Sequence, residues 1–400
     1  MPLRSRLGIQ FLRSPALAHP DHFDVNALLA YAVNHNREDE LIESGCADIR
    51  KLHGLGQTQV GLWRLPTASL FQDFCVDLAR QLSHDYVRGA AVDLRRGASD
   101  NASGDEECYT VTLADGTVIQ SSSVVLALGH TGSPVTPPKL RGMPDDKLIS
   151  WKQMRENVRP HHQHVLVVGG GLTAVQAAQH CLRQGKRVCL CSRRPLVERH
   201  FDIDTCWFDR RSANKHIADF YHQPDARRLA ALREVRGGGS VPQLYMADVR
   251  RWQARGQLTL VHDAEPTFDR ATEAGAWISL GGEPRAFDLV VNACGLRPDC
   301  TTSALVRNIL ARFSRKLIGG FPDVSVDLEW SRNLFVVGAL ASLNVGPDSG
   351  NIMGARRAAS IVANALECKS WLRDEKGRGA LANPFTELVW GEDDSSSDSD

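Results

Sequence analysis

Three consecutive glycines in the middle of the chain stand where they could hold phosphate groups. They follow the apolar run Val165 to Val168 and precede a segment whose apolar residues recur at helical spacing. Glycine lets a backbone approach a pyrophosphate closely, and the first turn of a helix offers free N–H groups and the positive end of its dipole. We expect a dinucleotide to bind here, with a plain glycine turn as the alternative. The pattern G-x-G-x-x-A is carried by Gly169, Gly170, Gly171, Leu172, Thr173 and Ala174.

The residues after the next expected strand indicate which dinucleotide fits. NAD sites usually have an Asp or Glu roughly 20 residues beyond the glycines that accepts from the ribose 2′-hydroxyl, whereas a 2′-phosphate is bound by arginine. In this chain Ser192, Arg193 and Arg194 stand at that place, and none of them is acidic. Two guanidinium groups can make charge-assisted, bidentate contacts to a phosphate. NADPH is therefore the expected nucleotide, and a solvated basic loop is the alternative.

These residues need a strand, a helix and a second strand to position them. The run 165–168 is apolar and short enough for a buried parallel strand. Apolar residues then recur at helical spacing from Val175 to Leu182, Gly185 ends the helix, and residues 187–191 are expected to form the next strand. The segment is one βαβ unit.

A different theme occurs twice, once on each side of this unit. Residues 109–120 alternate around the hairpin signal Asp115-Gly116, and the apolar strand that follows ends at Gly129. Residues 276–295 repeat the order of hairpin, apolar strand and glycine, ending at Gly295. We interpret the repetition as two dinucleotide-binding folds, one inserted in the other.

A third apolar strand near the C-terminus completes this pattern. Residues 333–340 contain Gly338 and lead through a polar turn into residues 352–366, whose apolar positions have helical spacing. The expected fold class is therefore α/β, with two Rossmann-like dinucleotide-binding domains, the NADP domain inserted in the other. The expected domains are 1–134 (first part of the outer domain), 135–300 (NADP domain), 301–385 (return of the outer domain) and 386–400 (a disordered acidic tail).

Composition excludes several classes of protein. The chain has 400 residues, 42% of them hydrophobic, with 47 basic and 47 acidic groups, so no basic field is available to hold nucleic acid. Five of the acidic groups lie in the last ten residues, which leaves a mildly basic body. No secretory signal or membrane span is apparent, and we expect a soluble, cytoplasmic protein.

Other polar or cysteine-containing segments give weaker signals. The ten cysteines include no C-x-x-C pair, which argues against a zinc ribbon and a dithiol of that spacing. Histidines 161, 162 and 164 are interpreted as a solvated lead-in to the strand, so no metal site is expected. The triple-glycine segment 237–242 is expected to be a loop, and whether it borders the nucleotide cleft is open.

Several segments resemble the two-dinucleotide flavoprotein superfamily. VVLALGHTGSP (124–134) and DLVVNACGLRPD (288–299) resemble its strand-to-glycine crossings, and residues 334–359 resemble its C-terminal flavin-contacting segment. The N-terminal segments around residues 11–32 and 62–82 resemble those of flavin-dependent monooxygenases, closest in layout to the lysine/ornithine N-monooxygenase-like branch and similar to flavin-containing monooxygenases. The resemblance spans roughly residues 8–370.

The resemblance implies that the outer domain (1–134 and 301–385) is an N-terminally incomplete FAD domain, with a flavin between the two halves. NADPH would reduce FAD, and a flavin C4a-hydroperoxide formed with molecular oxygen would oxygenate a small nucleophilic substrate. The helix that opens near residue 350 would direct its dipole at the flavin pyrimidine edge. No catalytic side chain is implied, and neither the substrate nor the oligomeric state is indicated. The cofactor contacts implied by the resemblance are Gly129, Gly295, Gly338, Gly346, Gly350 and Asn351.

The sequence departs from that superfamily before residue 129. An apolar strand, a G-x-G-x-x-G turn and a helix should precede this point, but Gly54-Leu55-Gly56 has polar residues before it and VGLWRLP after it. Ala339 also stands where many flavoproteins have aspartate. We expect an incomplete translation of a full enzyme that lacks its first βαβ unit. The alternative is a non-catalytic NADP-binding protein that descends from such an enzyme and has lost its FAD site.

Overall fold

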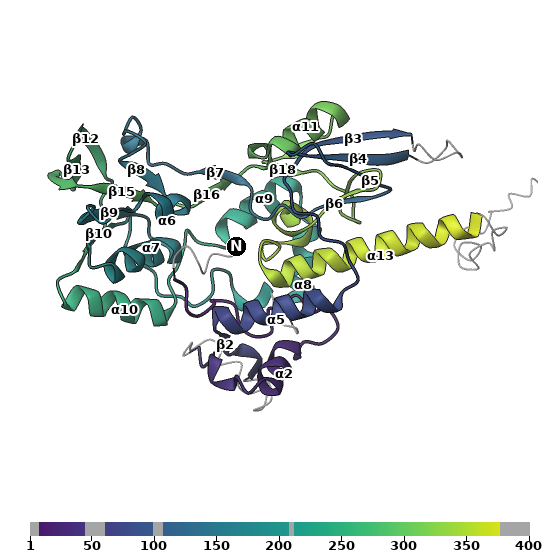
Figure 1. Cartoon of the computed structure of the whole chain (residues 1–400), viewed down its shortest axis with the longest axis horizontal. Helices are drawn as coiled ribbons and strands as arrows, with labels where there is room; N and C mark the ends of the chain where they lie inside the picture. The colour runs from purple at the N-terminus through teal and green to yellow at the C-terminus, as the bar shows by residue number, and fades with distance from the viewer. Residues whose placement is uncertain (1–7, 45–60, 99–106, 208–211, 377–400) are drawn as a thin grey trace, which may run out of the picture.

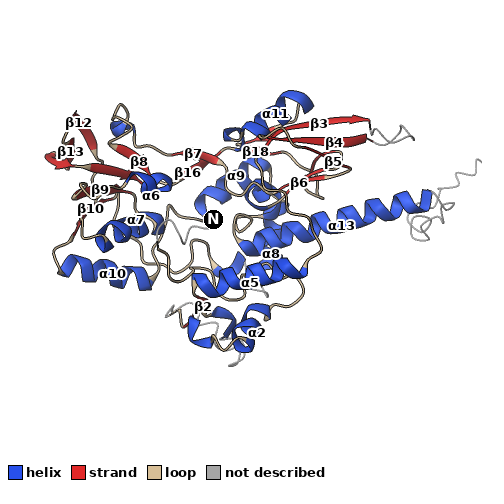
Figure 2. Ribbon diagram, viewed as in Figure 1, coloured by secondary structure: helices blue, strands red, loops and turns tan. Residues whose placement is uncertain are grey.

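Two α/β halves lie side by side in the computed structural model, with a helical unit packed below them (Figure 1; Figure 2). The structure describes residues 8–44, 61–98, 107–207 and 212–376. The expected acidic tail and Gly54-Leu55-Gly56 lie outside these ranges. No helix within them is both long and apolar enough to cross a bilayer.

The half at the left of Figure 1 is built on a five-stranded parallel sheet. Its strands follow each other in the order β11 (Leu258–Val261), β10 (Arg187–Cys191), β9 (His164–Val168), β15 (Leu289–Asn292) and β8 (Leu148–Ser150). Every neighbouring pair is parallel. Because both faces of such a sheet are covered, the central strands read as continuous apolar runs rather than alternating ones. The βαβ unit expected from the sequence is confirmed.

A helical layer and a β-meander cover the two faces of this sheet. Side chains of successive strand residues point to opposite faces. Val165 and Val167 thus pack with α7 (Leu172–Arg183) and α10 (Gln243–Ala254), while Leu166 and Val168 pack on the meander. The meander consists of β12 (Thr267–Thr272), β13 (Gly275–Leu280) and β14 (Glu283–Phe287).

The right-hand half repeats this order of elements in a shorter form (Figure 2). A meander of β3 (Ala91–Ala98), β4 (Glu107–Leu113) and β5 (Val118–Ser121) leads into the apolar strand β6 (Val124–Leu126). This strand pairs in parallel with β20 (Leu334–Val336), which pairs with β19 (Glu329–Ser331). The core of this half includes Tyr109 and Phe335 and is closed by α11 (Ala304–Phe313) and α13 (Ile352–Lys376). The repeated hairpin-and-strand theme is therefore confirmed.

Two antiparallel passages connect the halves. The passage β7 (Gly132–Pro134) leaves β6, and β16 (Leu296–Pro298) returns from β15. The strands β7 and β16 pair with each other. Strand β6 precedes the nucleotide half in the chain and pairs with β20, which follows that half. One half is thus inserted between neighbouring strands of the other.

The remaining elements are short. The helices are α6 (Met154–Asn157), α8 (Ala213–Tyr221), α9 (Asp225–Glu234) and α12 (Ser342–Val345). Strands β1 (Leu41–Ile42) and β2 (Leu65–Pro66) pair with each other, as do β17 (Leu317–Ile318) and β18 (Phe321–Pro322). Helices α2 (Ala27–Asn34) and α5 (Ala68–Gln81) pack around Leu28, Leu70 and Phe74.

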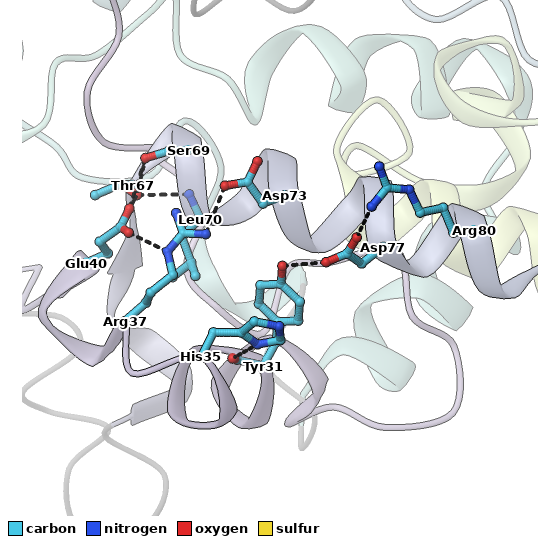
Figure 3. Close-up of polar contacts among 10 residues, drawn as sticks. All are labelled: Tyr31, His35, Arg37, Glu40, Thr67, Ser69, Leu70, Asp73, Asp77 and Arg80. Atoms are coloured by element: carbon cyan, nitrogen blue, oxygen red, sulfur yellow. Dashed lines mark hydrogen bonds and ion pairs between the residues drawn. The ribbon is translucent and has the colours of Figure 1, made fainter.

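A polar network ties this helical unit together (Figure 3). Glu40 accepts hydrogen bonds from Arg37 at 2.5 Å, from Ser69 at 2.9 Å and from Thr67, whose hydroxyl also caps α5. Arg37 donates in addition to Asp73 on α5, at 2.8 Å. The Arg37 guanidinium, followed by the two hydroxyls, lowers the pKa of Glu40 to about 2.

Glu40→Gln is therefore expected to destabilise the protein in a pH-dependent way. The depressed pKa means that the carboxylate stabilises the fold above its ordinary pKa of about 4.5 and loses this effect as pH falls through about 2. We expect a loss of about 1–2 kcal/mol at pH 7 that shrinks below pH 4.5, measured by urea unfolding across pH. Glu38→Gln, at an exposed neighbouring position, serves as the control. Equal losses for both variants would contradict the prediction.

Candidate functional site

The glycine turn after β9 packs against the end of β15 without room for a side chain. Gly169 has φ +149°, and a Cβ built on it would lie 2.4 Å from the carbonyl oxygen of Ala293. Its N–H donates to the carbonyl of Cys191 at 2.9 Å. The turn is thus fixed between the ends of its two neighbouring strands, and the first glycine is required by this approach.

The N-terminus of α7 is free of protein caps. Gly171 occupies the N-cap position, and no side chain bonds to the N–H groups of the first turn. The first N–H groups of a helix have no intrahelical partner and carry the positive end of the dipole. The helix opening at Leu172 and Thr173 is therefore an anion site that suits a pyrophosphate.

Gly169→Ala should disrupt this turn, because the new methyl group would meet a backbone carbonyl that cannot move freely. We expect a loss of about 1–3 kcal/mol in unfolding free energy and weaker NADPH binding. Gly185→Ala is the matched control, since Gly185 also has a positive φ of +78° but nothing lies within 4 Å of its built Cβ. Thermal unfolding and NADPH titration of both variants check the prediction, and a control loss equal to that of Gly169→Ala would refute the steric cause.

The arginine pair projects from the end of β10, next to the turn. Arg193 and Arg194 are both exposed, and Ser192 separates them from Cys191, the last residue of β10. Ser192 is buried, and its hydroxyl donates to the Arg194 carbonyl at 2.7 Å and lies 3.3 Å from Nδ1 of His262. The serine hydroxyl therefore shapes the loop that presents the two guanidinium groups.

A second glycine loop borders this turn, although the sequence left its place open. Gly239 lies against Gly171, with its built Cβ 3.2 Å from the Gly171 Cα. Arg194 donates a hydrogen bond to the carbonyl of Gly237. Residues 237–239 therefore lie over the glycine turn. In the sequence, the glycine triplet indicates a loop but does not predict which segment the loop contacts.

The glycines after the crossing strands form a second cluster in the other half. Gly129 and Gly338 follow the paired strands β6 and β20 and have φ values of +66° and +64°. Each stands in open space, since nothing lies within 4 Å of its built Cβ. The structure does not bring Gly295 to this cluster. It follows β15, and its carbonyl accepts from the N–H of Val135 at 3.1 Å.

The turn before α13 joins this cluster through His130. Nε2 of His130 lies 3.1 Å from the carbonyl oxygen of Gly350, and a Cβ on Gly350 would lie 2.4 Å from the imidazole. His130 is exposed at the surface, and its partial desolvation by neighbouring groups lowers its pKa, which favours the neutral form. Gly346 and Asn351 flank the turn, and the N–H of Asn351 donates to the Asp348 carbonyl at 2.7 Å. No local pattern around His130 predicts this contact, because Gly350 lies 220 residues away in the chain.

Asp348 is the buried charge of the same turn. Arg357 on α13 binds both of its carboxylate oxygens, at 3.0 and 3.1 Å, while the Asp348 side chain is 1% exposed. Burial raises the pKa of Asp348, and the Arg357 charge opposes that rise. The ion pair fixes the turn at the start of α13. Sequence analysis missed it, because nothing local distinguishes these two charges from solvated ones.

The outer edge of β6 has no partner strand within the described residues. Val124 donates to Asn333 and Leu126 accepts from Val337, so the N–H and C=O of Val125 between them face away from β20. Val125 is 42% exposed.

In the nucleotide half, the equivalent strand has a partner strand on both sides. Its crossing strand β15 lies between β8 and β9, and Val291 is fully buried. The N–H of Ala293 donates to Val168 of β9, immediately before the glycine turn. The described residues thus contain this phosphate turn beside β15, and they contain no counterpart beside β6. The crossing glycines and the turn before α13 lie together, since His130 contacts Gly350 and Ser349 donates to the Gly338 carbonyl.

Comparison with known proteins identifies this architecture. The family model described as pyridine nucleotide-disulphide oxidoreductase matches residues 75–215. No curated protein matches the sequence at a significant level.

Solved structures match over most of the chain. The ornithine N-hydroxylase of Kutzneria sp. 744 has 15% identity and a TM-score of 0.65, covering 90% of this chain and 88% of that one. The ornithine hydroxylase of Pseudomonas aeruginosa has 15% identity and a TM-score of 0.66, covering 92% and 89%. The cadaverine monooxygenase of Erwinia amylovora has 13% identity and a TM-score of 0.63, covering 91% and 85%. The chain therefore has the α/β fold of these proteins, as the sequence predicted.

Proposed function

We propose that the chain is an NADPH- and FAD-dependent oxidoreductase of the monooxygenase type. The observation that carries the proposal is the uncapped α7 N-terminus behind the turn at Gly169, with Arg193 and Arg194 exposed at the end of the adjacent strand. This arrangement suits a dinucleotide with a 2′-phosphate. The shared fold with two ornithine hydroxylases supports the class of reaction.

Each part of the nucleotide site has a separate task in this proposal. The N–H groups that open α7 hold the pyrophosphate, and the arginine pair binds the 2′-phosphate. Gly350 and Asn351, at the start of α13, would face the flavin pyrimidine edge and offer it a positive dipole end. The flavin, when bound, supplies electron transfer from NADPH to oxygen. The residues of the chain position the two cofactors and exclude water.

The substrate in this proposal is a small nucleophilic molecule, with molecular oxygen as co-substrate. Two of the structural relatives are named for ornithine and cadaverine, which are amines. Primary amines are therefore the first compounds to test. We further propose the cytoplasm as the compartment, because all nine described cysteines are free thiols, as a reducing environment would keep them.

Absorbance spectroscopy and NADPH oxidation test the proposal. Purified protein titrated with FAD should bind roughly one equivalent of flavin, with a shifted flavin spectrum, and should then oxidise NADPH under air. Adding ornithine or cadaverine separates substrate oxygenation, which yields a hydroxylated amine, from simple NADPH oxidase activity. Protein that binds no flavin would contradict the proposal for this chain.

A second candidate is a non-catalytic NADP-binding protein, favoured by the unpaired edge of β6. The flavin phosphate turn would lie beside that edge, as the nucleotide turn lies beside β15. This candidate predicts tight NADPH binding without NADPH oxidation, even with excess FAD. The same two titrations therefore discriminate the candidates.

A further inference from the structure

The glycine loop 237–239 has the construction of a hinge. Its three residues have φ values of +53°, +81° and +98°, a region that side chains other than glycine rarely adopt. The chain is anchored on both sides. Gly237 donates to the last residue of α9, Glu234, at 2.9 Å, and Val241 donates to Val197 at 2.9 Å. Motion is thus concentrated in the glycines between two fixed ends.

This loop covers the phosphate turn by backbone contact. A Cβ on Gly239 would lie 3.2 Å from Cα and 3.6 Å from N of Gly171, and 3.9 Å from the Gly170 carbonyl oxygen. The covered atoms include the N–H of Gly171, next to the free N–H groups that open α7. A pyrophosphate that approaches Gly171 therefore competes with the loop for the same space.

One of the two arginines holds the loop in this position. The guanidinium of Arg194 donates to the carbonyl of Gly237, and a Cβ on Gly238 would lie 2.5 Å from the same guanidinium nitrogen. Arg193 has no hydrogen-bond or ion-pair partner in the described part of the chain. The two neighbouring arginines thus differ, since only Arg194 connects the expected 2′-phosphate site to the loop over the pyrophosphate site.

We propose that Arg194 and loop 237–239 form a latch that selects nucleotides carrying a 2′-phosphate. The latch rests on the proposed function, because it assigns a specificity element to the same nucleotide site. A 2′-phosphate offers Arg194 a charged acceptor, which is a stronger partner than the Gly237 carbonyl. Arg194 then releases Gly237, and the loop leaves the phosphate turn.

A nucleotide without the 2′-phosphate cannot release Arg194 from Gly237, so the loop stays over the glycine turn. It must displace the loop and break the Arg194–Gly237 hydrogen bond without supplying a new partner for Arg194. Its apparent affinity is therefore reduced in proportion to the small fraction of molecules whose loop is open. The latch therefore weakens NAD binding, in addition to the direct attraction between the arginines and the 2′-phosphate of NADP.

Calorimetric titration of the whole chain with NADP⁺ and with NAD⁺ tests the latch. Arg194→Ala should weaken NADP⁺ binding and, because it frees the loop, should tighten NAD⁺ binding about fivefold. Arg193→Ala, the matched control, should weaken NADP⁺ binding about tenfold and leave NAD⁺ binding unchanged. Unchanged or weaker NAD⁺ binding in Arg194→Ala would overturn the latch.

A glycine variant tests the loop independently of the arginine. Gly239→Ala places a methyl group 3.2 Å from the Cα of Gly171, which disfavours the closed loop, so NAD⁺ binding should again tighten. Gly256→Ala controls for backbone strain, since Gly256 has φ +68° with nothing within 4 Å of its built Cβ. Tighter NAD⁺ binding in both glycine variants would contradict the latch.

Hydrogen exchange gives a direct readout of loop opening. Amides of residues 238–240, between the two anchored ends, should exchange faster with saturating NADP⁺ than without nucleotide, and continued protection of these amides with bound NADP⁺ would overturn the latch. Wild-type protein that binds neither nucleotide would instead overturn the proposed function on which the latch rests. The two failures are therefore distinguishable.

Discussion

Replacing Arg193 and Arg194 together by alanine is expected to weaken NADPH binding by about 2–4 kcal/mol. Each guanidinium can make a charge-assisted contact to the 2′-phosphate, worth about 1.5–3 kcal/mol, with some compensation when both are lost. Both side chains are exposed at the end of β10, so their loss leaves no buried group unpaired. The fold should stay intact, and calorimetric titration at constant ionic strength measures the effect.

The nucleotide without the 2′-phosphate provides the decisive comparison. Binding of NADH should not weaken in the double variant, and an equal loss for NADPH and NADH would exclude the 2′-phosphate role. A double variant of Arg187 and Arg255 removes the same charge from exposed positions of the same half. Arg187 begins β10 and therefore lies at the opposite end of that strand from the arginine pair. This control should bind NADPH like the wild type.

Replacing Arg357 by leucine is expected to cost about 3–5 kcal/mol of unfolding free energy at pH 7. Arg357 binds both oxygens of Asp348, whose side chain is 1% exposed, so its loss leaves a buried carboxylate without its counter-charge. The turn before α13 should loosen at the same time, because the pair connects that turn to the helix. Urea unfolding measures the loss.

The pH dependence of this variant identifies the buried charge as the cause. Burial already raises the pKa of Asp348, and removing the opposing Arg357 charge raises it further. The folded state then binds a proton more tightly than the unfolded state, so the deficit should be greatest at neutral pH and shrink as pH falls through the raised pKa. A deficit that grows on acidification would contradict this cause.

A neutral replacement of both partners separates the charge from the packing. Asp348→Asn combined with Arg357→Met removes the pair without leaving a charge in the interior. We expect this double variant to recover most of the lost stability, because neutral replacement of a buried ion pair is often well tolerated. A loss as large as that of Arg357→Leu alone would indicate that packing around α13 dominates.

The local elements of the nucleotide half were predictable from the sequence. A continuous apolar run, a glycine turn and a helical apolar spacing fix β9, the turn and α7 through contacts between residues close in sequence. The hairpin signals at residues 115–116 and 281–282 likewise place the two meanders. The repetition of these patterns was enough to predict two related folds with one inserted in the other.

The contacts that shape the site could not be predicted in this way. Loop 237–239 is far from Gly171 in sequence, and its own glycines specify only that the backbone can bend. The pairing of Asp348 with Arg357, the approach of His130 to Gly350 and the unpaired edge of β6 depend on where distant segments meet. Burial of a charge or exposure of a strand edge is a property of the assembled chain.

The sequence by itself determined the type and order of the elements and the position of the glycine turn before α7, because periodicity and glycine act over one or two turns of chain. Only the tertiary structure decided which of two adjacent arginines holds a loop over that turn. It also decided that, among the strands the structure describes, β6 has one neighbour where β15 has two. Both results depend on the path of the chain through space, which residue spacing does not encode.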